Sequence, residues 1–323
     1  MTNETRELHV VLGAGQVGPG LAAALVARGH RVRVVTRTAP AIDGVEHVRA
    51  DLTEPDAAAA ALRGADVVYD VTNPASYARW AALLPPLRRG IRQACAKVGA
   101  HLVVLDNLYM LEVPEDGTLR ETTPRRPRSR KGELRRLLEA ELLDAVARGE
   151  LRATIGRASD FFGPGAGAHS FFGDDAIRRL AAGKSVFVLG DPDLPRSYSY
   201  VPDVIEGLAR LGEARPGGVF HLPVAWKEGS TRQLVEALAA ELGVAPLATR
   251  VPGWMLAVLG IFVRDLGAVR EMLYQWESRF VVDDSAFCAR FGVRATPVAQ
   301  AITSSVAAAR GEVLAPTGAL HVE

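Results

Sequence analysis

The sequence has few of the features that mark secreted, membrane-spanning or disulfide-linked proteins. Among its 323 residues only Cys95 and Cys288 are cysteines, too few for a disulfide framework and wrongly spaced for a zinc site. The first ten residues, MTNETRELHV, lack the apolar core of a signal peptide. The most apolar later run, Val251 to Val263, contains proline and glycine and is too short to cross a bilayer. We therefore expect a cytoplasmic protein with no membrane partner.

Charge and catalytic motifs are scarce as well. The chain has 38 basic and 37 acidic residues, a net charge of +1, so no overall field attracts it to nucleic acid. The seven histidines are scattered without an H-E-x-x-H pattern, and no G-x-S-x-G nucleophile elbow occurs. The sequence therefore predicts no nucleic-acid partner and no metal site, and it argues against a hydrolase or a metalloenzyme.

The first half does contain a regular alternation of strand-length apolar segments with helical ones. Leu8 to Leu12 is a short apolar run suited to a strand that is buried on both faces. Strands separated by helices predict an α/β fold, a Rossmann-type doubly wound parallel sheet with helices on both faces. The further strands are predicted at 31–36, 45–51, 65–71, 101–106 and 152–159. In the second half, helices are predicted at 169–184 and, mostly apolar, at 254–280.

The first strand runs directly into a glycine-rich turn, GAGQVG, at residues 13–18. Gly13 permits the tight turn, Gly15 lets the backbone approach a pyrophosphate, and Gly18 lets helix and strand pack closely. The helix that follows presents free amides and a positive dipole end to phosphates. A turn of purely structural glycines is the alternative. The position between a strand and a helix favours dinucleotide binding, with Gln16 and Val17 as further contacts.

The end of the second strand bears on the choice of coenzyme. An acidic residue there would bind the adenosine ribose of NAD, but the chain has Thr36 and Arg37. Arg37 could pair with a 2′-phosphate, so NADP(H) is favoured over NAD(H). The alternative is that Arg37 only caps an exposed strand end.

With these segments in order, the chain resembles the extended short-chain dehydrogenase/reductase family, also called the NAD-dependent epimerase/dehydratase family. The resemblance implies that Asp51 and Leu52, after strand three, contact the adenine. It implies a dinucleotide-binding domain over 1–160 and a smaller C-terminal α/β substrate domain over 161–323, from which a segment near 197–212 returns to the first. The segments that carry it, besides the glycine turn, are DVTNPA (70–75), ETTPRRP (121–127), GRASDFFGPG (156–165), GDPDLPRSYSYVPDVIEGLARL (190–211) and GGVFHLPVAWKEGSTRQLVEALAAELG (217–243). The resemblance implies that Thr72, Asn73 and Pro74 of the first of these segments line the cofactor.

The expected catalytic triad of that family is missing. Asn107 stands near the usual serine or threonine, and the tyrosine-x-x-x-lysine pattern falls on Lys131 and Arg135. Asn107 could polarise a carbonyl, and Arg135 could hold the ribose hydroxyls. The proton donor is then Tyr109, just past strand five, or Lys131, or another group or water. Nearby cations are expected to lower the pKa of either candidate. The plain alternatives are a half-buried strand-edge tyrosine and a solvated helix lysine.

Two further groups of residues are ambiguous in the same way. A basic stretch from Arg125 to Arg136 is either a solvated face, offset by nearby glutamates, or an anion site. Aromatic residues after the last predicted strand either line an apolar pocket or belong to the core. The residues predicted to contact the substrate are Phe161, Phe162, Arg196 and Tyr198.

The functional prediction is an NAD(P)-dependent oxidoreductase that moves hydride between the nicotinamide and a carbonyl or alcohol carbon of a small molecule. Two alternatives stay open. The first is a nucleotide-sugar epimerase or dehydratase, and the second is a non-catalytic NADP-binding sensor. Because related enzymes often dimerise through the helices beside the catalytic site, the resemblance also suggests a homodimer whose interface could include the charged helix at 131–147.

Overall fold

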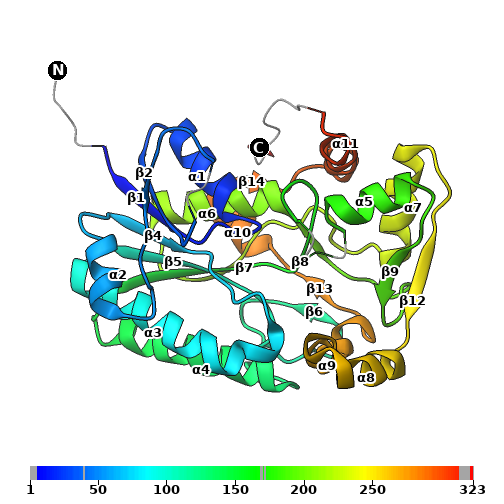
Figure 1. Ribbon diagram of the computed structural model, residues 1–323, viewed down its shortest axis with the longest axis horizontal. Helices are drawn as coiled ribbons and strands as arrows, with labels where there is room; N and C mark the ends of the chain where they lie inside the picture. Colours follow the sequence, from blue (N-terminus) through cyan, green and yellow to red (C-terminus); the bar gives the residue numbers. More distant parts are fainter. Residues whose placement is uncertain (1–5, 39–40, 168–169, 171, 313–320, 323) are drawn as a thin grey trace.

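The computed structural model describes residues 6–38, 41–167, 170, 172–312 and 321–322 (Figure 1). Within these residues one large sheet runs in the order β11-β7-β5-β4-β1-β2-β3, with every neighbouring pair parallel. This confirms the predicted doubly wound parallel sheet, whose winding reverses between β1 and β4, where such sheets bind ligands. Its strands are β1 (Leu8–Leu12), β2 (Arg31–Val35), β3 (Val45–Val48), β4 (Val67–Asp70), β5 (His101–Asp106), β7 (Arg152–Arg157) and β11 (Gly218–His221).

Helices cover both faces of this sheet, as Figure 1 shows. Because successive side chains of a strand point to opposite faces, Val10 and Leu12 of β1 enter one apolar cluster and Val11 enters the other. Both clusters are fully buried, which explains why the strand is apolar on nearly every residue. The helices are α1 (Gly18–Ala27) and α6 (Val201–Ala214) on one face, and α2 (Pro55–Ala61), α3 (Trp80–Val98) and α4 (Arg130–Ala147) on the other.

The second half of the chain forms a smaller α/β unit beside the carboxyl ends of the strands. The helix expected over 169–184 is shorter and begins after Gly173, while residues 168, 169 and 171 lie outside the described part. The division of the chain at residue 160 stays a prediction. The elements are β8 (Asp160–Phe162) paired with β10 (Tyr198–Tyr200), β9 (Val186–Leu189) paired with β12 (Ala248–Val251), and the helices α5 (Asp174–Ala181), α7 (Thr231–Leu242) and α11 (Val298–Ala309).

The apolar segment expected to be helical over 254–280 is broken into α8 (Gly253–Phe262), α9 (Arg264–Arg270) and a short 3-10 helix, η2 (Leu273–Trp276). The break falls at Val263, whose backbone is extended. The segment packs over the ends of the strands, where Met272 and Trp276 join a buried cluster with Trp80 and Tyr109. No helix in the described ranges is long and apolar enough to span a bilayer.

The remaining elements are short. They join the two parts of the chain or lie near the C-terminus. They are η1 (Tyr77–Arg79), β6 (Thr118–Leu119), β13 (Val281–Val282), α10 (Ser285–Phe291), β14 (Val293–Arg294) and β15 (His321–Val322).

Candidate functional site

The glycine turn of residues 13–18 joins β1 to α1, and its three glycines are required for different reasons. Gly13 has φ +97°, a left-handed conformation that side chains disfavour. A side chain on Gly18 would overlap the carbonyl of Gly13. Gly15 has neither constraint, since its φ is not left-handed and, apart from its chain neighbours, no atom of the described residues lies within 4 Å of the place where a Cβ would be. The fold itself therefore gives no reason for glycine at position 15.

The start of α1 is suited to an anion. The first amides of a helix are not used within it, although Pro19 in this first turn has none, and the first turn holds no acidic side chain. Val17, the residue before the helix, is buried and anchors the turn in the core. The side chain of Gln16 points elsewhere, because its amide donates to the carbonyl of Ala166 and so ties the turn to the second half of the chain.

The ends of β2 and β3 lie side by side next to this turn. Arg37 is exposed and forms no hydrogen bond or ion pair with any residue that the structure describes. The hydroxyl of Thr36 donates to the carbonyl of Thr38. Asp51 is exposed, and hydrogen bonds from the hydroxyl and amide of Thr53 lower its pKa. Leu52 packs against the core below. An arginine without a partner among the described residues thus follows β2, and an exposed carboxylate follows β3.

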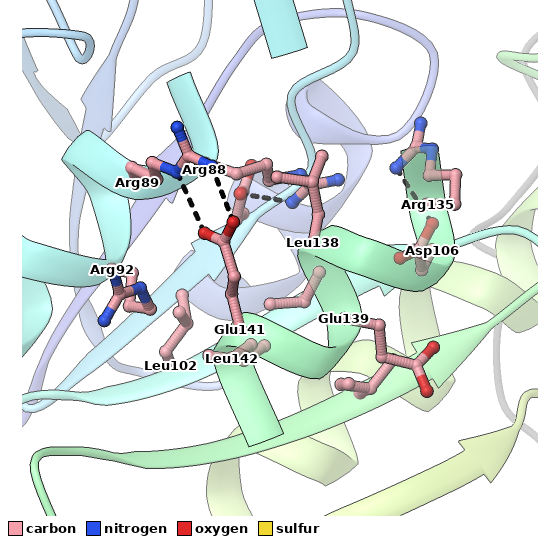
Figure 2. Close-up of a pocket in the computed structure, with 13 residues that line it drawn as sticks. Arg88, Arg89, Arg92, Leu102, Asp106, Arg135, Leu138, Glu139, Glu141 and Leu142 are labelled. Atoms are coloured by element: carbon pink, nitrogen blue, oxygen red, sulfur yellow. Dashed lines mark hydrogen bonds and ion pairs between the residues drawn. The ribbon is translucent and has the colours of Figure 1, made fainter. Parts of the chain in front are cut away.

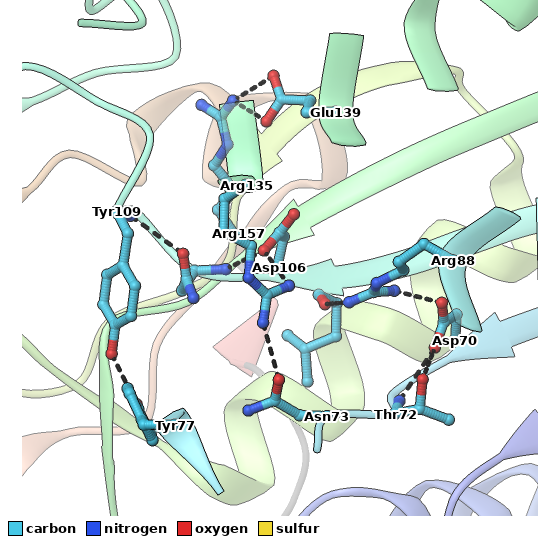
Figure 3. A network of polar contacts seen from close by, with 12 residues as sticks. Asp70, Thr72, Asn73, Tyr77, Arg88, Asp106, Tyr109, Arg135, Glu139 and Arg157 are labelled. Carbon is cyan, nitrogen blue, oxygen red and sulfur yellow. Dashed lines mark hydrogen bonds and ion pairs between the residues drawn. The ribbon is translucent and has the colours of Figure 1, made fainter. Parts of the chain in front are cut away.

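A network of charged and polar side chains lies at the ends of β4 and β5 (Figure 3). Asp70 ends β4, and its carboxylate accepts from the amide and hydroxyl of Thr72 at 3.0 and 2.6 Å. The same carboxylate is ion-paired with Arg88 of α3. This pairing fixes the path of the chain that leads to Asn73 and Pro74.

Arg135 bridges the two strand ends. One terminal nitrogen donates to Asp106 at 2.8 Å and the other to Asn73 at 2.9 Å, and the guanidinium stacks on Trp80 with 4.6 Å to the ring centroid. The side chain is 4% exposed. Ser129 caps the helix by accepting from the amide of Gly132, which sets Arg135 on the buried side of α4. The planar fork of arginine is what makes this double contact possible.

Two phenols meet beside this bridge. The hydroxyl oxygens of Tyr109 and Tyr77 lie 2.9 Å apart, and Tyr109 is nearly buried. Burial, followed by the neighbouring Tyr77 and Asp160, raises the pKa of Tyr109 well above 10, and Arg135 offsets this only in part. The expectation that cations lower the pKa of Tyr109 is therefore wrong, because desolvation outweighs them. Asn107 accepts from the amide of Tyr109 at 3.0 Å.

Lys131 does not point freely into this region. Its ammonium is ion-paired with Glu271, and the same carboxylate accepts from the backbone amide of Arg130. A second carboxylate of the same segment, Asp265, accepts from Ser76 and from the amide of Ala78 at 2.9 Å each. The α9 segment is thus fastened to both the loop after β4 and the start of α4.

The basic stretch at 125–136 is largely neutralised within the protein. Arg125 is ion-paired with Glu139, and Arg136 donates to Glu133 at 2.7 Å. Glu139 is also paired with Arg157 at 2.6 Å, and both of these side chains are fully buried. Together with the pairs of Lys131 and Arg135, these contacts favour a structural and surface role for the stretch over an anion site.

The residues predicted to contact substrate are mostly turned inward. Arg196 is buried, donates to Asp160 and to the carbonyl of Gln275, and stacks on Trp276. The Tyr198 hydroxyl contacts Thr231 at 2.7 Å. Of the aromatic residues, Phe162 and Phe172 are buried in the core of the second half, while Phe161 is partly buried and Phe171 lies outside the described residues.

A small cavity lies under the network, between α3, α4 and β5 (Figure 2). Its volume is about 30 Å³, enough for roughly one water molecule and too small for a substrate. Charged side chains from both helices line it, among them Arg88, Arg135 and Glu139. The cavity is therefore part of the polar support of the site and is not a substrate pocket.

Three residues of this site were missed by the sequence reasoning. Tyr77, Asp106 and Glu271 contact predicted residues directly, but they come from three different segments of the chain. Asp106 ends a predicted strand and is next to Asn107, so its position was a usable sign. Nothing in the sequence marks Tyr77 or Glu271, because only folding brings them to the site.

Comparisons with known proteins support the fold and the coenzyme. A model of the NAD dependent epimerase/dehydratase family matches residues 91–222, and an NAD(P)H-binding model matches residues 13–144. No curated protein sequence matches the chain.

Solved structures share the fold at low sequence identity. The chain resembles a UDP-glucose 4-epimerase of Thermus thermophilus in complex with NAD, with TM-score 0.77, 22% identity, and coverage of 95% of this chain and 100% of that one. It also resembles a putative epimerase from Burkholderia cenocepacia, with TM-score 0.76, 18% identity, and coverage of 95% and 99%. A third similar structure is a UDP-N-acetylglucosamine 4-epimerase from Bacillus cereus, with TM-score 0.76, 13% identity, and coverage of 96% of this chain and 99% of that one.

Proposed function

This chain belongs to the NAD-dependent epimerase/dehydratase family, and from that premise we propose that it is an NADP(H)-dependent oxidoreductase of a small carbonyl compound or alcohol. The observation that carries the coenzyme site is the open space over Gly15. A glycine that the fold does not need is explained when a pyrophosphate lies against its backbone. When bound, the coenzyme supplies the hydride.

The residues around the glycine turn have assigned roles in this proposal. The amides of Gly15, Gln16, Val17 and Gly18 hold the pyrophosphate at the start of α1, while Gly13 shapes the turn. Residues at the strand ends bind the rest of the coenzyme. Asp51 and Leu52 contact the adenine, and Thr36 and Arg37 contact the 2′-phosphate. The nicotinamide end lies against Thr72, Asn73 and Pro74. Arg135 acts by holding Asn73 in place, since both of its terminal nitrogens are already bound.

Tyr109 is the proposed proton donor, and Tyr77 replenishes its proton. The 2.9 Å contact between their hydroxyls forms a short relay. A phenol with a raised pKa stays protonated at neutral pH, so it can donate to an oxygen that gains negative charge but is a poor base. The proposed direction is therefore reduction of a carbonyl. In this proposal the amide nitrogen of Asn107 polarises that carbonyl, since its amide oxygen already accepts from the backbone amide of Tyr109.

A nucleotide-sugar epimerase is the second candidate, supported by the shared fold with UDP-sugar epimerases. The internal ion pair of Arg196 with Asp160 counts against a diphosphate held at that residue. A non-catalytic NADP-binding sensor is the third candidate, and it predicts coenzyme binding without turnover.

The proposal predicts that the purified protein oxidises NADPH in the presence of at least one member of a panel of aldehydes, ketones and quinones. The measurement is the loss of NADPH absorbance, with product identified by mass spectrometry. Tight NADPH binding without turnover on the whole panel would support the sensor. A co-purified UDP- or TDP-sugar that changes configuration at one carbon would support the epimerase.

Arg37→Ala tests the coenzyme preference. Because Arg37 is exposed and unpaired among the described residues, its loss removes only its contact with the 2′-phosphate. A lost hydrogen bond between charged groups costs about 1.5–3 kcal/mol, or roughly a tenfold to hundredfold weaker Kd for NADPH. The Kd for NADH should stay nearly unchanged.

The control for this prediction is Arg63→Ala, an exposed arginine after α2. Both coenzymes should bind that variant as they bind the wild type. Equal weakening of NADPH and NADH in Arg37→Ala would remove the case for NADP(H).

A further inference from the structure

Two histidines and a glutamate meet at the amino end of the sheet. His9 is the second residue of β1, His30 directly precedes β2, and Glu7 directly precedes β1. The parallel register pairs Leu8 with Arg31, which places these three residues side by side. One possible ligand atom from each lies within 4.8 Å of the others. Positions 9 and 30 are far apart in the sequence, which explains why no metal site is predicted from it.

The spacing of these atoms suits a small metal ion. Nε2 of His9 lies 3.4 Å from Oε2 of Glu7. Two ligands of a tetrahedral zinc ion with bonds of about 2.0–2.1 Å are separated by about 3.3 Å. The His9 and His30 rings are closer than this requires, with centroids 3.9 Å apart and planes tilted by 32°, so the partly exposed His30 ring turns outward when both bind one ion. The side chain of His9 is fully buried, whereas those of Glu7 and His30 are 42% and 20% exposed, so an ion can enter from the solvent side.

Each of the three side chains is held by a partner outside the cluster. The Tyr69 hydroxyl contacts Nδ1 of His9 at 2.9 Å, and Glu213 contacts Nε2 of His30 at 3.2 Å. Arg215 binds Oε1 of Glu7 at 2.5 Å, which leaves Oε2 directed at His9. Hydroxyl and carboxylate partners of this kind orient the ligands of metal sites and fix the histidine tautomer.

The charge state also suits a cation. The surrounding cations are already paired. Arg28 is bound to Glu206 and lies 3.6 Å from Glu213, and Arg215 is bound to Glu7.

We infer that Glu7, His9 and His30 form a binding site for a divalent transition metal, with zinc as the best match and water as the fourth ligand. Two imidazoles and one carboxylate are a ligand set that zinc accepts, and an open fourth position is common when the protein supplies three. The site lies at the opposite end of β1 from Gly13, so it is separate from the proposed coenzyme site and independent of the proposed function.

The test uses cobalt as a visible probe for zinc. Chelator-treated protein is titrated with Co²⁺, and the d–d absorption is followed at each addition. We expect one Co²⁺ per chain, displaced by one equivalent of Zn²⁺. His30→Ala and Glu7→Gln should weaken Co²⁺ binding at least about tenfold, and Tyr69→Phe should weaken it roughly 10–100-fold by freeing the His9 ring. These variants leave the buried His9 in place.

His47→Ala is the matched control, since His47 is exposed on β3 and contacts only Thr36 among the described residues. It should bind Co²⁺ as the wild type does. Zinc should also raise the Tm of the wild type by a few degrees and leave that of His30→Ala unchanged. No d–d absorption, or equal binding by wild type, His30→Ala and Glu7→Gln, would overturn the inference.

Discussion

Replacing Tyr109 with phenylalanine is expected to lower kcat for carbonyl reduction by about 10²–10⁴-fold, the usual contribution of a general acid. The phenyl ring preserves the packing of Tyr109 against Trp80, whose ring centroid lies 6.1 Å away. The change therefore removes the proposed proton donor and its hydrogen bond with the Tyr77 hydroxyl, and it keeps the ring packing. Steady-state kinetics with NADPH measure it, and KM should change far less than kcat.

The pH profile distinguishes a proton donor from a structural hydroxyl. Because the pKa of Tyr109 is raised well above 10, the phenol keeps its proton through the accessible range. The rate of reduction should therefore stay level as pH rises to about 9, as far as this group is concerned. A rate that climbs with pH over the same range would mean that a phenolate base is at work.

Two further variants serve as controls for this prediction. Tyr274→Phe removes a hydroxyl on η2 that accepts from Gln275 at 3.3 Å, and it should leave kcat unchanged. Tyr77→Phe should slow turnover less than Tyr109→Phe, because Tyr77 acts only through its neighbour. If Tyr109→Phe costs tenfold or less, Lys131 or water becomes the better donor.

Gly15→Ala should weaken binding of both NADPH and NADH by at least about tenfold, or about 1.4 kcal/mol. Apart from the chain neighbours of Gly15, the added methyl group meets no atom within 4 Å in the described part of the chain, so it enters the space that the pyrophosphate is proposed to occupy. A glycine-to-alanine change at a compatible backbone position stabilises a protein by about 0.4–1 kcal/mol. The Tm should therefore stay the same or rise slightly. Calorimetry with each coenzyme and a thermal melt together measure the two effects.

Gly18→Ala is the contrasting variant. Its methyl group would overlap the carbonyl of Gly13, and overpacking of this kind costs about 1–3 kcal/mol. We expect a lower Tm as well as weaker coenzyme binding. If Gly15→Ala binds NADPH like the wild type, the glycine turn is a structural turn, and the proposed coenzyme site fails with it.

The sheet was readable from the sequence because its signals are local. The apolar run at 8–12 and the segment at 101–106 coincide with β1 and β5, since strands buried on both faces are apolar throughout. The glycine turn was readable for the same reason. The helix expected to run through 254–280 was broken at Val263, because an apolar composition marks burial but not where a helix ends.

The side-chain partnerships of the site could not be read in this way. Tyr109 lies just past β5 and Tyr77 lies in η1, 32 positions earlier in the sequence. Lys131 is paired with Glu271, which is 140 positions away. The sequence also cannot show how deeply a group is buried, so the pKa of Tyr109 was predicted in the wrong direction. Which side chains meet, and how far each is removed from water, depend on the tertiary fold. The spacing of motifs in the sequence gives no information on either.

Arg135 constrains how this site can evolve. It serves Asp106, Asn73 and the ring of Trp80 at once. The family resemblance leads one to expect a lysine at 135. An ammonium is a point charge without the planar fork of arginine, so it would leave Asp106 or Asn73 without its hydrogen bond. A tyrosine at 131 would likewise leave Glu271 without its cation. Each single substitution toward the common arrangement therefore leaves a polar partner unpaired, so positions 131 and 135 can adopt that arrangement without loss of stability only if their partners change as well.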